Sequence, residues 1–146
     1  MTGKGVVNDC GGVGGRDYTN FVFEVHMKIV VGDCGGIDFR KANQSWAGYY
    51  FQVCQNGTYR LLLVTRSGKT ALIANGASPF ISSGFQAENL IAVVAKGAKL
   101  VFYVNHQQIY GTNDSTYSHG LMDISAATGD STLTQVVYWD ASVWTL

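Results

Sequence analysis

The feature that most constrains the fold of this chain is an alternation of apolar and polar residues with a period of two. Between Phe21 and Val30 every odd-numbered residue is apolar, whereas the even-numbered ones include Glu24, His26 and Lys28. Such a period sends the two sets of side chains to opposite faces of an extended strand. Similar runs recur along the chain, separated by glycine-rich turns. The pattern predicts about eight to twelve short strands, hardly any helix, and an all-β sandwich.

One turn and one apolar segment refine this prediction. Asn56-Gly57 stands between two β-rich runs and predicts a hairpin with a type I′ turn, in which both central residues have positive φ. Residues 86–96 contain good helix formers, and their apolar residues also fit a helical stripe. The apolar run is short and β-branched, and Lys96-Gly97 closes it directly before another strand pattern. We therefore predict a buried strand there.

Length and composition indicate one domain after a distinct N-terminal segment. Residues 1–16 are rich in glycine and show little periodicity, so we expect a loop or a loosely held edge segment there. Residues 17–146 are expected to form a single β-sandwich domain, because 146 residues are too few for two comfortable domains.

The charge balance excludes a general nucleic-acid or anionic-membrane binder. The chain has 10 Lys and Arg against 10 Asp and Glu, whereas such binders need a surplus of basic residues. No apolar run is long enough to span a membrane, and no signal peptide is visible. We expect an extracellular or cell-surface location, with a signal or anchor that is not in this chain.

The three cysteines, Cys10, Cys34 and Cys54, allow one disulfide and one remaining thiol. Their wide spacing fits no zinc pattern. The sequence does not decide which two of them pair.

Five motifs occur in order along the chain: Asn20-Phe21-Val22-Phe23-Glu24-Val25, Gly35-Gly36-Ile37-Asp38-Phe39-Arg40, Gly48-Tyr49-Tyr50-Phe51-Gln52-Val53, Leu100-Val101-Phe102-Tyr103-Val104-Asn105 and Val143-Trp144-Thr145-Leu146. They resemble the concanavalin A-like lectin/glucanase superfamily, and in particular its laminin G-like (LamG) modules and the bacterial modules called domain of unknown function 1080. The resemblance covers about Asp17 to Leu146. The resemblance implies a jelly-roll β-sandwich of two antiparallel sheets. Such domains usually begin with a further strand or two, so we expect this chain to be about one strand short at the N-terminus and to leave a sheet edge open.

The resemblance directs attention to a concave sheet face that could bind sugars through aromatic rings and planar polar groups. If Ile37, Phe39, Phe51 and Val53 face the core, the period of two turns the residues between them outward. The predicted ligand-binding residues are Asp38, Arg40, Trp46, Tyr50, Gln52 and Tyr103. The alternative interpretation is that Asp38 and Arg40 form a surface pair and that the tyrosines are ordinary strand residues.

These observations leave three hypotheses of function. The first is a non-catalytic, lectin-like module that binds a glycan or a cell-surface polymer. The second is a structural protein that assembles into homo-oligomers through an open sheet edge or its N-terminal arm. The third and weakest is a glycoside hydrolase, because the two glutamates, Glu24 and Glu88, do not form the paired carboxylates that such an enzyme needs, and Asp38 stands alone on its strand.

No cofactor is expected, although a structural calcium ion stays an open alternative. Calcium is common in the superfamily, and four aspartates in expected loops could contribute oxygen ligands: Asp33, Asp114, Asp123 and Asp130. No contiguous calcium-binding loop is present, so the metal stays unknown.

Overall fold

The computed structural model describes residues 7–9 and 15–146, and these residues form eleven strands and no helix. The part of the chain that is described therefore contains no helix able to cross a membrane. The strands are β1 (Val7–Asp9), β2 (Phe21–Val31), β3 (Cys34–Lys41), β4 (Gly48–Cys54), β5 (Thr58–Val64), β6 (Thr70–Ala77), β7 (Glu88–Lys96), β8 (Lys99–Val104), β9 (Gln107–Asn113), β10 (Leu121–Ala127) and β11 (Gln135–Thr145).

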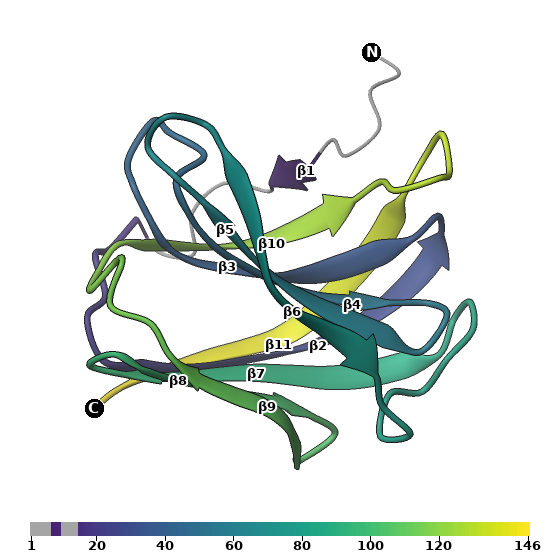
Figure 1. Cartoon of the computed structure of the whole chain (residues 1–146). Coiled ribbons are helices and arrows are strands. Elements are labelled where there is room, and N and C mark those ends of the chain that lie inside the picture. The colour runs from purple at the N-terminus through teal and green to yellow at the C-terminus, as the bar shows by residue number, and fades with distance from the viewer. Residues whose placement is uncertain (1–6, 10–14) are drawn as a thin grey trace.

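The strands form two antiparallel sheets that pack face to face (Figure 1). One sheet has six strands in the order β1-β10-β3-β4-β5-β6, and the other has five in the order β11-β2-β7-β8-β9. The core lies between them and takes apolar side chains from both, such as Phe23 and Phe102 from the five-stranded sheet and Phe39 and Phe51 from the six-stranded one. The predicted all-β jelly-roll sandwich is confirmed.

In β2, the alternation of residue types in the sequence matches the alternation of buried and half-buried side chains in the structure. Phe21, Phe23, Val25, Met27 and Ile29 are buried in the core, and the residues between them are half-buried. The segment with mixed signals, residues 86–96, contains the strand β7, which pairs with β2 on one side and with β8 on the other. The prediction of a buried strand is therefore confirmed.

The hairpin at Asn56-Gly57 is present, but its turn differs from the predicted one. The loop between β4 and β5 has three residues, 55–57, and the Gly57 N–H donates to the Cys54 carbonyl at 3.1 Å. Gly57 has a φ of +83°, whereas Asn56 is not among the described residues with positive φ. A type I′ turn needs both, so the prediction of that turn type is wrong, and the loop belongs to the longer hairpins that place glycine at the left-handed position.

The N-terminal segment contributes a strand where we expected an open edge. β1 pairs antiparallel with β10, from Val7 opposite Ala127 to Asp9 opposite Ser125. The expectation that the chain is one strand short is therefore wrong, since three residues of the segment 1–16 supply the edge strand. Residues 1–6 and 10–14, together with Cys10, lie outside the described residues.

The disulfide joins Cys34 and Cys54, which are direct partners on the neighbouring strands β3 and β4. Core residues alternate with them on both strands, so both cysteines point to the outer face of the six-stranded sheet. There they form a small buried cluster with Ala127 of β10.

Candidate functional site

The outer face of the six-stranded sheet is shaped by a β-bulge in β3. Lys41 lies opposite Leu121 and Asp38 lies opposite Asp123, so two residues of β3, Phe39 and Arg40, face the single residue Met122 of β10. Arg40 has a φ of +50°. An extra residue in one strand shifts the alternation of every side chain that follows it. The bulge therefore decides which of Arg40 and Lys41 reaches the outer face.

Arg40 does not point to the outer face, so its predicted direction is wrong. Its guanidinium donates to the carbonyl of Thr19 at 2.8 Å and to that of Tyr117 at 3.0 Å. These carbonyls belong to the segments that lead into β2 and β10, at one end of the sandwich. The side chain is buried, and burial lowers the pKa of Arg40. The charge interaction with the neighbouring core residue Tyr49 acts in the opposite direction and raises this pKa. Arg40 thus closes the end of the sandwich and is not available to a ligand on the outer face.

Lys41 takes the place on the outer face that we predicted for Arg40. Its Nζ lies 2.7 Å from Oδ2 of Asp123, and both side chains are buried. The same ammonium lies 5.6 Å from the ring centroid of Trp46 and 6.0 Å from that of Tyr50. At such distances a cation is attracted to the face of an aromatic ring. Lys41, which sequence reasoning did not identify, therefore contacts both the aromatic residues Trp46 and Tyr50 and the carboxylate of Asp123 on the neighbouring strand β10.

Three predicted site residues lie on this face but are buried within it. Asp38 is 0% exposed, and its Oδ1 accepts a hydrogen bond from the Ser125 hydroxyl at 2.8 Å. Gln52 is 1% exposed, and its Oε1 accepts from the Nε of Arg60 at 2.5 Å. The hydroxyl of Tyr50 donates to the Trp46 carbonyl at 2.5 Å. These groups fix their neighbours, and a ligand cannot reach them directly.

Trp46 is the predicted site residue that solvent reaches most freely. It lies in the loop between β3 and β4, and 56% of its surface is exposed. Its carbonyl is held by Tyr50, and Lys41 lies against its ring. Two residues of the sheet, Tyr50 and Lys41, therefore hold Trp46 in its position in the loop, although the residue is largely exposed to solvent.

Tyr103 does not join this group. Its strand, β8, belongs to the five-stranded sheet, and its neighbours Phe102 and Val104 face the core. The side chain therefore points outward on the opposite side of the sandwich. The alternation correctly predicted an outward direction, but the prediction that Tyr103 shares a patch with Asp38 is wrong, because the alternation does not tell which sheet a strand joins.

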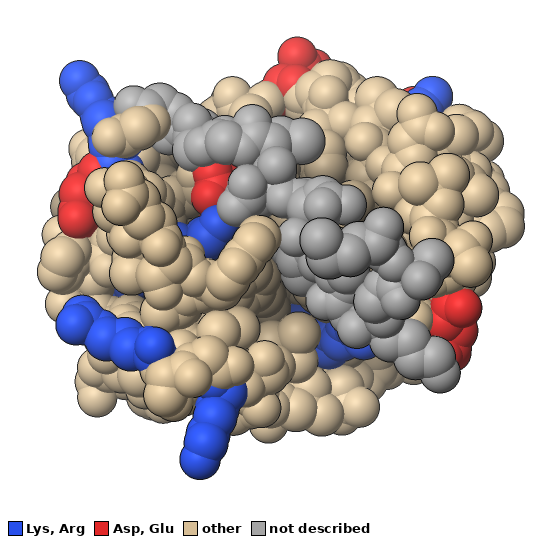
Figure 2. All heavy atoms as spheres, turned by 90° about the horizontal axis from the view of Figure 1, so that it is seen from above, with Lys and Arg blue, Asp and Glu red and all other residues tan. Residues whose placement is uncertain are grey.

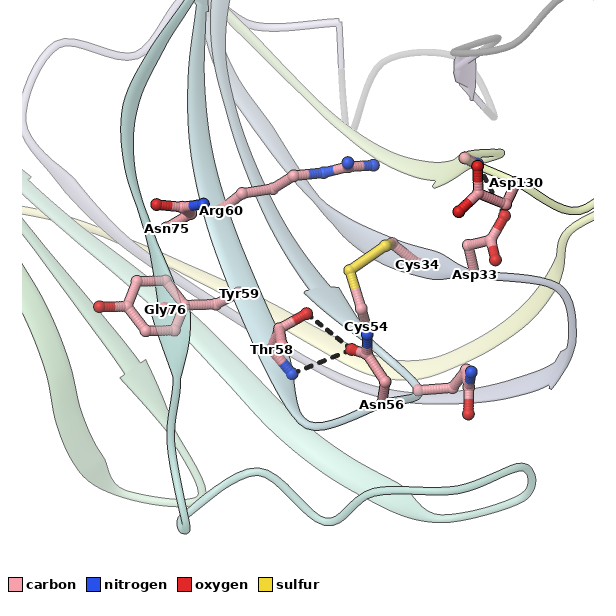
Figure 3. Close-up of a pocket in the computed structure, with 12 residues that line it drawn as sticks. Asp33, Cys34, Cys54, Asn56, Thr58, Tyr59, Arg60, Asn75, Gly76 and Asp130 are labelled. Carbon is pink, nitrogen blue, oxygen red and sulfur yellow. Dashed lines mark hydrogen bonds between the residues drawn. A yellow bond between two sulfur atoms is a disulfide. The ribbon is translucent and has the colours of Figure 1, made fainter.

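The other end of the outer face holds a pocket of about 310 Å³ (Figure 3). Arg60 extends from β5 across the strands towards the side on which Asp33 and Asp130 lie, and the disulfide lies between them. The lining comes from four strands and three connections: Asp33, Cys34, Cys54, Gln55, Asn56, Thr58, Tyr59, Arg60, Asn75, Gly76, Gly129 and Asp130.

Asp33 holds the loop between β10 and β11, which forms one wall of the pocket. Its Oδ2 accepts hydrogen bonds from the Gly129 N–H at 2.6 Å, the Ser131 N–H at 3.1 Å and the Ser131 hydroxyl at 2.6 Å. The hydrogen bonds from Ser131, together with one from Gly129 and the charge of Arg60, lower the pKa of Asp33 against an opposing effect of burial. The carboxylate is therefore ionised at neutral pH.

Among the pocket residues, Arg60 and Asn75 were missed by sequence reasoning, although a signal for them existed. In the hairpin built on Asn56-Gly57, Arg60 is the register partner of Gln52, and Asn75 is the partner of Arg60 on the next strand. Once Gln52 was placed on the outer face, counting back through the turns would have placed the other two beside it. No comparable signal marked Lys41, because the bulge depends on β10.

Apart from Asp38 and Asp123, which are register partners on β3 and β10, the carboxylates considered for calcium or for catalysis lie in different parts of the described structure. Asp114 accepts from the hydroxyl of Tyr49 at 2.5 Å, and Asp123 pairs with Lys41. Asp33 and Asp130, however, line the same pocket. The described residues contain no group of three or more His, Cys, Asp or Glu side chains that could hold a metal ion. Glu24 and Glu88 both belong to the five-stranded sheet, away from this face.

Charge on this side of the molecule is sparse and mixed. Figure 2 views the molecule from the side of the six-stranded sheet, and its Lys and Arg atoms lie among Asp and Glu atoms in a mostly uncharged surface. The visible surface therefore favours no strongly charged partner.

No protein-family model matches the sequence, and no curated protein matches it significantly. Solved structures do match. A carbohydrate-binding module of Bacillus subtilis, CBM66, has a TM-score of 0.74 at 17% identity and covers 88% of this chain and 76% of its own. The galectin LEC-6 of Caenorhabditis elegans has a TM-score of 0.63 at 15% identity, with 96% and 90% covered.

A β-glucanase of Bacillus licheniformis has a TM-score of 0.59 at 12% identity, with 90% of this chain and 68% of that chain covered. Identities this low establish the fold and not the activity. The chain therefore has the concanavalin A-like jelly-roll fold that binding modules, galectins and glucanases share.

Proposed function

We propose that the chain is a non-catalytic, lectin-like module that binds a glycan or a cell-surface polymer on the outer face of its six-stranded sheet. We place it with the LamG-like and domain of unknown function 1080-like modules, at an extracellular or cell-surface location and without a cofactor. The fold it shares with a carbohydrate-binding module and a galectin supports sugar binding in general.

The observation that carries the proposal is the supported, exposed indole of Trp46. Its surface is 56% exposed, the ammonium of Lys41 lies 5.6 Å from its ring centroid, and Tyr50 holds its carbonyl. An aromatic ring that is already oriented can stack against the apolar C–H face of a sugar without a large loss of conformational freedom. Trp46 is thus the contact through which we expect a glycan to bind.

The buried carboxylates of this face support a binding role over a catalytic one. Asp38 and Asp123 are register partners on β3 and β10. Asp123 is neutralised by Lys41, and Asp38 accepts from Ser125 and is fully buried. A glycosidase needs one carboxylic acid and one carboxylate on either side of an accessible sugar bond. These two are engaged by the protein itself.

A glycan array followed by calorimetric titration with the best ligand tests the proposal. Trp46→Ala is expected to weaken binding by about tenfold, because it removes the stacking surface. Phe85→Ala is the matched control, since Phe85 is 55% exposed but lies in the connection between β6 and β7. Binding of no glycan, or equal binding by wild type and Trp46→Ala, would overturn the proposal.

The edge strand β6 supports a second candidate, self-assembly by strand pairing. It is the last strand of the six-stranded sheet, its sequence from Thr70 to Ala77 contains no charged residue, and Leu72 is largely exposed. Uncharged edge strands can pair with a second chain. Light scattering of the purified chain decides this candidate: a monomer at high concentration excludes it, and a dimer lost in Leu72→Lys supports it.

A further inference from the structure

The pocket beside the disulfide lies at the opposite end of the outer face from Trp46, and the predicted sugar-binding residues do not include its lining. We propose that this pocket binds a single neutral sugar residue, held between the guanidinium of Arg60 and the carboxylates of Asp33 and Asp130. The inference rests on the proposed function, which it extends to a second site and to a ligand class.

The size of the pocket points to a small ligand. Its volume of about 310 Å³ lies at the lower end of the range for ligand pockets, which is roughly 300 to 1,000 Å³. One face of the site is the Cys34–Cys54 disulfide, which is an apolar surface, whereas the remaining side chains are mostly polar (Figure 3). A ring with one C–H face and several hydroxyl groups matches this division.

Arg60 supplies hydrogen-bond donors in a fixed direction. Its Nε donates to Gln52, which is buried and cannot move freely. The two terminal nitrogens, Nη1 and Nη2, have no hydrogen-bond partner among the described residues, and the side chain reaches across the pocket. A guanidinium held by its Nε presents the remaining donors as a planar fork. Two adjacent hydroxyl oxygens of a sugar would accept from it.

The opposite wall supplies acceptors. Asp33 uses Oδ2 for the backbone and side chain of the loop at Gly129 and Ser131, and its Oδ1 has no hydrogen-bond partner among the described residues. Asp130 is exposed at the same rim. Each sugar hydroxyl can donate one hydrogen bond and accept others, so it can use both walls.

Two amides complete the site. The Oδ1 of Asn56 accepts from the N–H and the hydroxyl of Thr58, at 3.2 and 2.6 Å. This pairing leaves the side-chain NH₂ of Asn56 as a donor. Asn75, the register partner of Arg60, adds an exposed amide on β6.

The charges of the lining select against acidic sugars. One arginine faces two aspartates, and Asp33 is ionised at neutral pH, so an added carboxylate or sulfate would meet a net negative wall. A uronic acid could pair with Arg60 only beside the carboxylates of Asp33 and Asp130. Neutral hydroxyl groups avoid this repulsion, and for that reason we assign a neutral residue, such as a hexose at the end of a glycan chain.

The test combines ¹⁵N-NMR titration of the intact chain with calorimetry. The probes are the methyl glycosides of glucose, galactose, mannose and fructose, and glucuronic and galacturonic acid. We expect at least one neutral glycoside to shift the side-chain amide signals of Asn56 and Asn75, and the uronic acids to bind about tenfold more weakly. Arg60→Met should weaken the neutral ligand about tenfold or more, whereas Arg66→Met, at the exposed turn after β5, should leave it unchanged.

The outcomes separate this inference from the proposed function. A glycan that binds through Trp46 while the Asn56 and Asn75 signals stay in place with every probe would overturn the pocket and leave the function standing. Tighter binding of a uronic acid than of any neutral glycoside would overturn the ligand class. Pocket signals that respond in Trp46→Ala as in wild type would support a separate site. The amide shifts are measured on wild type, so the result does not depend on the folding of Arg60→Met.

Discussion

The buried ion pair between Lys41 and Asp123 gives the sharpest prediction about stability. Replacing Lys41→Met keeps the length of the side chain and removes its charge. At 2.7 Å the attraction between the two charges is about 6 kcal/mol with an effective dielectric constant of about 20. The desolvation of the ammonium offsets part of this energy, but the Asp123 carboxylate stays buried, and its Oδ1 already lacks a hydrogen-bond partner among the described residues. We expect a loss of about 3 to 5 kcal/mol.

The assay is equilibrium unfolding in urea at pH 7, followed by circular dichroism. Tryptophan fluorescence is a poorer probe here, because Lys41 lies against Trp46 and its replacement changes the signal directly. A slope of about 1 to 3 kcal/mol per molar urea converts the expected loss into a midpoint lower by at least about 1 M. Lys69→Met is the control, since Lys69 is exposed in the turn before β6 and should change the stability by less than about 0.5 kcal/mol.

A double-mutant cycle isolates the ion pair from the contacts of Lys41 with Trp46 and Tyr50. Lys41→Met combined with Asp123→Leu removes both charges, so most of the lost stability should return. Two results would refute the reasoning: a Lys41→Met variant as stable as the Lys69→Met control, or a double variant whose loss equals the sum of the single losses. Either result would mean that the bulge does not bury Lys41 against Asp123.

Three further predictions concern the Cys34–Cys54 disulfide, the hydrogen bonds of Asp33 to the loop between β10 and β11, and the buried hydroxyl of Tyr49. The Cys34–Cys54 bridge spans a sequence separation of 20, which corresponds to about 3 kcal/mol in the chain-entropy treatment. Reducing agent should lower the urea midpoint of wild type and leave a Cys34→Ala/Cys54→Ala variant unchanged; equal responses contradict the pairing. The lowered pKa of Asp33 contributes stability above its ordinary pKa of about 4, and this contribution disappears as the pH falls through the lower native value. The difference in the free energy of unfolding between wild type and Asp33→Asn should therefore shrink from pH 7 to pH 3. A constant difference would contradict the role of the Asp33 carboxylate in holding the loop at Gly129 and Ser131. Burial and the hydrogen bond to Asp114 raise the pKa of Tyr49 to about 12, so this tyrosine should ionise late, and the stability it contributes should fall between pH 10 and 12. Tyr49→Phe should remove that late step from an ultraviolet titration and cost about 1 to 3 kcal/mol at pH 7, whereas a late step that persists would assign it to another tyrosine.

The core residues of β2 could be predicted from the local sequence alone. The side chains of an extended strand alternate between its faces, whatever its partners are, so Phe21, Phe23 and Val25 could be assigned to one buried face before any pairing was known. The same reasoning placed Asp38 and Gln52 opposite the core and Tyr103 outward on its own strand. The two-faced sandwich itself was predictable for this reason.

The composition of the site depended on pairing between distant parts of the chain. Arg40 and Lys41 exchange faces because β3 carries one residue more than β10 across the bulge, and Lys41 is 82 residues away from its partner Asp123. Similarly, nothing near Tyr103 shows that β8 joins the five-stranded sheet, and nothing in the spacing of the cysteines shows that Cys34 and Cys54 are direct partners.

The sequence by itself therefore determined the all-β class and, wherever a strand is regular, which residues face the core and which point outward, because these follow from the geometry of a single extended chain. Only the tertiary structure decided that Lys41 replaces Arg40, that Tyr103 lies on the far side, and that Arg60 and Asn75 meet Asp33 and Asp130 around one pocket. The register and order of the strands set these contacts, and both come from hydrogen bonds between segments that are far apart in the sequence.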